Sequence, residues 1–102
     1  CGYELGLLFY NLISNAIDSI LPKTGKIFIT IQKKEFIEIT VLDTGTAISE
    51  DQAQKIKNRI LFSTKGGSHG SGMKIIYDII DKYNAELEVV RRQNSGFRIY
   101  FP

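Results

Sequence analysis

The sequence has few of the residues that build disulfide frameworks or metal clusters. Its 102 residues include one cysteine, one histidine and no tryptophan. A single cysteine excludes a disulfide within the chain, and it argues with the single histidine against a zinc site. No apolar run approaches the roughly 20 residues that a membrane-spanning helix needs. The 13 basic and 11 acidic residues nearly balance, and the lack of a basic stripe argues against nucleic acid as a partner.

The composition that remains is that of an ordinary globular domain. The hydrophobic share is 43% and the charged share is 24%, and a chain of this length can bury a core of its own. The sequence has no initiator methionine and enters a helical pattern almost at once. We therefore expect residues 1–102 to form one domain taken from a longer protein.

Hydrophobic periodicity divides the chain into helices and strands. The predicted elements are helices over 3–21, 50–60 and 72–84 and strands over 26–33, 36–43, 86–91 and 97–101. Ser49 is followed three residues later by Gln52, which is typical of a capping box at a helix start. The last two strands are expected to be joined by a turn at residues 94–96, Asn-Ser-Gly. This order predicts an α/β (α+β) two-layer sandwich, with the helices on one face of a mixed, largely antiparallel sheet.

The first predicted helix carries two asparagines one turn apart. Asn11 and Asn15 share a polar stripe with Asp18. Asparagine is a poor helix former, and its carbonyl oxygen is a hard ligand of the kind that Mg²⁺ takes. A solvated helix face would show the same spacing, so the stripe alone leaves both interpretations open.

Asp43 ends the second predicted strand on its apolar side. Strand alternation places Asp43 with Ile39 and Val41, on the side that must be buried. A buried carboxylate needs a partner, and the exocyclic amine of a purine would serve. Gly45 would let the backbone pass close to a flat ligand. An Asx-turn that closes the strand is the alternative.

A glycine-rich segment, residues 66–72, leads directly into the last predicted helix. Backbone N–H groups exposed before a helix N-terminus favour phosphate, and the ammonium group of Lys65 could neutralise its charge. The segment has neither the setting of a Rossmann loop nor the Gly-Lys-Ser/Thr of a P-loop. A plain surface loop is the alternative.

In this order the segments resemble the sequence boxes of the GHKL (Bergerat-fold) ATP-binding superfamily. Residues 8–17 (LFYNLISNAI) resemble its N box, and residues 43–48 (DTGTAI) resemble its G1 box. Residues 61–65 look like the F-box region, and residues 70–73 (GSGM) resemble the G2 box. The resemblance covers essentially the whole chain and implies the Bergerat fold. The Ser-Thr-Lys entry to the lid and its His-Gly-x-Gly ending look most like sensor histidine kinases of the AgrC-like peptide quorum-sensing branch. Kinases of the nitrogen-regulator type have a similar lid entry.

The resemblance implies roles for the matching positions. Asn15, assisted by Asn11, would coordinate Mg²⁺ on the phosphates of ATP, and these two are the expected catalytic and metal-binding residues. Asp43 would bind the adenine amino group. The other positions expected to contact the nucleotide are Gly45, Ala47, Ile48, Lys65, Gly70, Ser71, Gly72 and Met73.

The first N-box position bears on the reaction. Hydrolytic relatives of the gyrase, Hsp90 and MutL types carry a glutamate there to activate water, whereas Asn11 cannot act as a general base at neutral pH. The resemblance thus implies a histidine protein kinase that positions Mg-ATP for transfer to a histidine on a separate dimerisation domain. It also implies a homodimeric, membrane-anchored parent with a cytoplasmic catalytic end that acts through a response regulator.

Three residues depart from the family's pattern. Ala47 replaces the last G1 glycine, Phe97 stands where many relatives have a threonine near the adenine, and Asp18 stands where kinases often have a basic residue. They keep an alternative open, in which the chain is a degenerate GHKL-fold module with a docking role and weak or no nucleotide binding.

Overall fold

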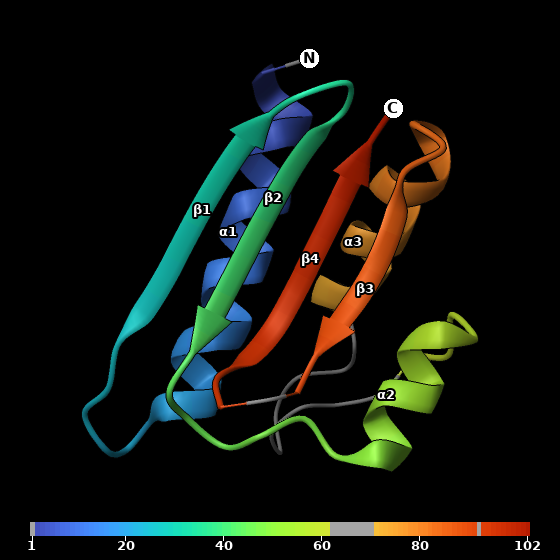
Figure 1. Ribbon diagram of the computed structural model, residues 1–102. Coiled ribbons are helices and arrows are strands. Elements are labelled where there is room, and N and C mark those ends of the chain that lie inside the picture. Colours follow the sequence, from blue (N-terminus) through green and yellow to red (C-terminus); the bar gives the residue numbers. More distant parts are fainter. Residues whose placement is uncertain (1, 62–70, 92) are drawn as a thin grey trace.

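Helices cover one face of a four-stranded sheet in the computed structural model, which describes residues 2–61, 71–91 and 93–102 (Figure 1). The elements are α1 (Gly2–Ile20), β1 (Ile27–Lys33), β2 (Ile37–Asp43), α2 (Glu50–Lys57), α3 (Ser71–Lys82), β3 (Glu86–Val90) and β4 (Ser95–Phe101). No helix in the described ranges is long and apolar enough to span a bilayer.

The strand order is β1-β2-β4-β3, and each neighbouring pair is antiparallel. Figure 1 shows α1 and α3 side by side behind the sheet, with α2 beside the end of β3. The predicted two-layer α/β sandwich is therefore confirmed. The parallel pair that a mixed sheet would contain does not occur among the described strands.

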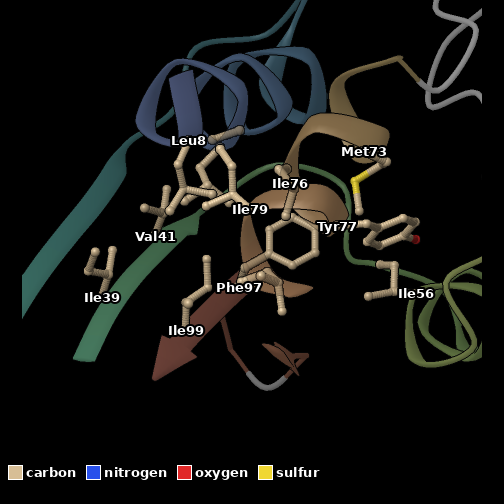
Figure 2. Close-up of a cluster of buried hydrophobic side chains, with 13 residues drawn as sticks. Leu8, Ile39, Val41, Ile56, Met73, Ile76, Tyr77, Ile79, Phe97 and Ile99 are labelled. Carbon is tan, nitrogen blue, oxygen red and sulfur yellow. The ribbon is translucent and has the colours of Figure 1, made fainter. Parts of the chain in front are cut away.

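The core forms where α1 and α3 cover the two central strands. Alternate side chains of β2 and β4 point toward the helices because successive strand residues face opposite sides of the sheet. Figure 2 shows Phe97 at the centre of this cluster, with Ile76 and Ile99 close by. The buried apolar residues are Leu8, Leu12, Ala16, Ile39, Val41, Ile56, Met73, Ile76, Tyr77, Ile79, Ile80, Phe97 and Ile99.

The edge strand β1 shows the predicted alternation of side chains, but its apolar side is largely exposed. Ile29 and Ile31 lie on the helix side of the sheet, opposite Val41 and Ile39, yet they are 47% and 58% exposed. Helix α1 makes more contacts with β2 than with β1, so this side of β1 receives less cover. Periodicity located the strand correctly, but it does not tell whether a neighbouring element covers an apolar face.

The predicted turn at residues 94–96 is wrong in its position. Ser95 and Gly96 belong to β4, where they pair with Asp43 and Leu42 of β2. A Cβ on Gly96 would lie 1.9 Å from the carbonyl oxygen of Val41. Glycine is therefore needed here for the close approach of two strands and not for a turn.

The capping box at the start of α2 is confirmed. The Gln52 N–H donates to Ser49 Oγ at 3.1 Å, and the Ser49 N–H donates to Gln52 Oε1 at 3.2 Å. The helix ends three residues before the predicted position, because Arg59 takes a positive φ of 58°. The Ile60 N–H then donates to the Lys55 carbonyl at 2.8 Å, which closes a Schellman motif.

Helix α3 ends in the same way. Asn84 has a φ of 53°, a conformation that asparagine tolerates better than most residues. The Ala85 N–H donates to the Ile80 carbonyl at 2.9 Å, and the chain then enters β3. The helix thus stops at Lys82, two residues before the predicted end.

Candidate functional site

The two asparagines of α1 have different surroundings. Asn11 is only 8% exposed, and its Nδ2 donates to the Leu7 carbonyl at 2.8 Å. Its Oδ1 faces the start of α3, because a Cβ on Gly72 would lie 2.9 Å from that oxygen. Asn15 instead lines a cavity, with its Nδ2 3.5 Å from Met73 Sδ. No described residue donates a hydrogen bond to the Asn15 amide oxygen, so none of them competes with a ligand for it.

Asp43 ends β2 with its side chain turned inward. The residue is 6% exposed and lines the same cavity as Asn15. Its Oδ1 accepts the Gly45 N–H at 2.8 Å and the Ser19 hydroxyl at 2.8 Å. The strand-parity prediction of a buried carboxylate is therefore confirmed, and the Asx-turn is present with it.

The loop after Asp43 rests directly on the last turn of α1. The Thr46 N–H donates to the Ser19 carbonyl at 3.0 Å. A Cβ on Gly45 would lie 2.3 Å from that same carbonyl oxygen, and real Cβ atoms essentially never approach so closely. Only glycine lets this loop pack against α1.

The cavity has a volume of about 160 Å³ and lies between α1, the end of β2 and α2. Its walls are mostly apolar, and three of the lining side chains, Met73, Phe97 and Ile56, belong to the core cluster of Figure 2. The residues that line it are Leu12, Asn15, Ala16, Asp18, Ser19, Val41, Asp43, Thr46, Ala47, Ile48, Gln52, Ile56, Met73, Gly96 and Phe97. An apolar pocket with a few convergent polar groups is the usual form of a small-molecule site.

The structure brings most of the predicted residues to one place. Those lining the cavity are Asn15, Asp43, Ala47, Ile48 and Met73. Gly45 packs against Ser19 of this lining, Gly72 packs against Asn11, and Ser71 is the first residue of α3. Lys65 and Gly70 lie outside the described residues.

Sequence reasoning did not assign several residues of the lining to the site, among them Ser19, Thr46, Gln52 and Ile56. For Ser19 a signal existed, because it follows Asn15 by four residues and so lies on the same side of α1. Gln52 was assigned only to the helix cap. Nothing in its pattern indicates that it also faces a cavity.

A comparison with known families agrees with this geometry. The sequence profile of the family described as "Histidine kinase-, DNA gyrase B-, and HSP90-like ATPase" matches residues 3–102. The chain belongs to this ATPase family. Membership in it implies a site for ATP, and the cavity beside Asp43 and Asn15 is the candidate for that site among the described residues.

Individual relatives are kinases by name. The chain is 29% identical to sporulation kinase E and 33% identical to sporulation kinase A of Bacillus subtilis, in each case over 97% of its length. It spans only 14% and 16% of those two proteins. Among solved structures, the catalytic domain of histidine kinase ThkA matches with a TM-score of 0.81 and 27% identity, over 98% of this chain and 67% of that one.

Proposed function

We propose that this domain binds Mg-ATP in the cavity and positions the γ-phosphoryl group for transfer to a histidine on a separate dimerisation domain. It would then be the catalytic domain of a two-component sensor histidine kinase. The observation that supports this most directly is the inward carboxylate of Asp43, which shares an apolar cavity with Asn15. The names of the sporulation kinases and of ThkA support the choice of reaction.

The enclosed part of the site suits a flat base. Its volume of about 160 Å³ is below the roughly 300 Å³ at which whole-ligand pockets begin. Apolar side chains such as Ile48 and Met73 would contact the faces of the ring. Asp43 would accept a hydrogen bond from the exocyclic amine at the ring's edge. The sugar and phosphates would then extend out of the cavity toward α3.

The phosphates need positive charge that the described lining does not provide. Asp18 and Asp43 line the cavity, and neither lysine nor arginine does so among the described residues. Mg²⁺ bound to the phosphates would supply that charge, held by the free amide oxygen of Asn15 with Asn11 behind it. An ion that keeps water and phosphate ligands needs only one or two protein oxygens, so this donor set fits. Residues 65 and 70–72 would complete the phosphate site, with Lys65 as the cation and the N-terminus of α3 as a source of N–H donors.

The nucleophile that attacks the γ-phosphoryl group decides whether the reaction is hydrolysis or transfer to a protein. Asn11 cannot take a proton from water at neutral pH, and its Nδ2 is bonded within α1. A domain built in this way positions the nucleotide and neutralises charge, which is most of what phosphoryl transfer requires. An imidazole from the dimerisation domain would then attack the γ-phosphorus.

The whole protein is expected to be larger than this chain. We infer a homodimeric, membrane-anchored parent with this domain in the cytoplasm, signalling to a response regulator. Residues 63–72 support assignment to the AgrC-like branch. The relatives named above carry other names, so that branch stays a proposal.

Isothermal titration with ATP and Mg²⁺ tests the binding site. Asp43→Asn replaces an acceptor with a group that also donates, and we expect ATP affinity to fall about 10- to 100-fold, as for a lost hydrogen bond to a charged group. Asp78→Asn is the matched control, because Asp78 is exposed on α3, lies outside the cavity lining and pairs with Lys74. Equal ATP affinity in the wild type and Asp43→Asn would contradict the site.

Phosphotransfer tests the reaction. The domain should phosphorylate a histidine-bearing dimerisation domain of a related kinase added in trans, and it should release little phosphate alone. Steady phosphate release without an acceptor would instead favour a hydrolase. A folded domain that binds no ATP would be the degenerate docking module.

A further inference from the structure

The Asp43 carboxylate is held through one oxygen only. Oδ1 accepts both the Gly45 N–H and the Ser19 hydroxyl, each at 2.8 Å. Within the described part of the chain, Oδ2 accepts no hydrogen bond. Oδ1 is therefore saturated, while no described residue occupies the lone pairs of Oδ2.

The free oxygen must face the cavity. Asp43 is 6% exposed and lines the cavity, and the described residues contain no fully buried side-chain oxygen or nitrogen without a partner. Oδ2 therefore retains access to the space inside the cavity. An ionised carboxylate oxygen only accepts hydrogen bonds, so this point of the wall requires a donor from the ligand.

Ser19 ties the carboxylate to the helix that carries Asn15. The Gly45 bond is local to the loop and moves with it, whereas Ser19 lies 24 residues earlier in the sequence. Its Oγ is also 2.9 Å from the Thr46 carbonyl, but a hydroxyl has one proton. The charged Asp43 oxygen is the stronger acceptor and should take that proton. The carboxylate group then cannot rotate freely about its Cβ–Cγ bond.

We propose that Ser19 is a positioning residue that selects the base, an inference that rests on the proposed ATP site. By holding Oδ1, it presents Oδ2 as an acceptor at the place where adenine carries its exocyclic amine. Hypoxanthine carries a carbonyl oxygen there and an N–H on the neighbouring ring nitrogen. Two acceptors would face one another, unless the carboxylate turned to reach that N–H. Ser19 prevents this turn, so the site rejects inosine triphosphate (ITP).

The test measures ATP and ITP affinity, with Mg²⁺ present, in the wild type and in Ser19→Ala. Wild type should prefer ATP. In Ser19→Ala, ATP affinity should fall about three- to tenfold, as for the loss of one hydrogen bond, while ITP affinity falls less or rises. The ATP/ITP ratio should therefore shrink. Ser19→Thr, which keeps the hydroxyl, should restore it.

The matched control is Ser14→Ala, the same change on the same helix at a residue outside the cavity lining. An equal loss of ATP and ITP affinity in Ser19→Ala, or no loss of either, would overturn the role of Ser19. Should Ser19→Ala fail to fold, Ser19→Cys carries the same test, because a thiol is a weak donor of similar size. A wild type that binds no ATP, or binds it equally well as Asp43→Asn, refutes the proposed site itself.

Discussion

Polar side chains are arranged differently at the two ends of the helix layer. At the closed end, around Glu4, they form hydrogen bonds with one another, and at the open end, around Asp43 and Asn15, they face a cavity. Near the start of α1, Glu4 accepts hydrogen bonds from the ammonium group of Lys82, the last residue of α3, at 2.7 Å, and from the hydroxyl of Tyr83, which follows α3. Near the end of α1, Asp43 and Asn15 each keep an oxygen that no described residue uses, and both line the cavity. Polar groups that satisfy one another hold two helices together, whereas open acceptors in an apolar wall make a binding site.

The largest effect on stability and ATP affinity is expected at Gly45, where the loop after β2 packs most tightly against α1. Gly45→Ala would place a Cβ 2.3 Å from the Ser19 carbonyl oxygen, so the loop that carries Asp43 must move. We expect a loss of about 2 kcal/mol or more in the free energy of unfolding, together with a large loss of ATP affinity. Chemical denaturation and nucleotide titration would measure the two effects.

Gly6→Ala provides the control for that change. Gly6 is exposed within α1, and an added Cβ would meet nothing within 4 Å. Alanine in a helix interior should stabilise the domain by about 0.5–1 kcal/mol and leave ATP binding unchanged. Equal stability of the two variants would mean that the loop does not rest on α1 as described.

A medium effect is expected at α2, which forms one wall of the open end. Ser49→Ala removes the side-chain acceptor of the capping box and should cost about 1 kcal/mol of stability. Because Gln52 and Ile56 of α2 line the cavity, ATP affinity should also decline modestly. A thermal melt with and without ATP measures both effects. A variant as stable as the wild type would show that the cap contributes nothing to the fold.

The smallest effect is expected at the closed end, and it should depend on pH. Hydrogen bonds from Lys82 and Tyr83 lower the pKa of Glu4, whose side chain is 22% exposed. A lowered folded-state pKa stabilises the fold above the unfolded-state value, and this contribution is lost as the pH falls through the folded-state pKa. The hydrogen bond to Glu4 raises the pKa of Tyr83. The contribution of the Tyr83 hydroxyl to stability is therefore lost as the pH rises through this raised pKa.

Glu4→Gln tests this end. Its melting temperature should lie slightly below that of the wild type between about pH 5 and pH 10, in line with the small contribution of exposed ion pairs. The gap should close in more acidic solution, where the wild-type carboxylate is protonated. ATP affinity should not change. A gap that persists at low pH would show that Glu4 acts through packing and not through charge.

The sequence predicted the frame of the site better than its details. Alternation placed Asp43 inward, and the motif at Ser49 located the start of α2, because both depend on neighbours in the chain. The contact of Ser19 with Asp43 depends on the packing of α1 against a distant loop. No local pattern encodes it. The turn-like composition at residues 94–96 was overridden for the same reason, since Gly96 serves the close approach of β2 and β4.

The exposed apolar side of β1 bears on how the isolated domain behaves at high concentration. An edge strand exposes backbone donors and acceptors that can pair with another strand, and Ile29 and Ile31 add exposed apolar surface on the same strand. Two molecules that pair along this strand would form one continuous sheet. Self-association should therefore begin at the side of the domain away from β3, and dilute samples will give the cleanest nucleotide titrations.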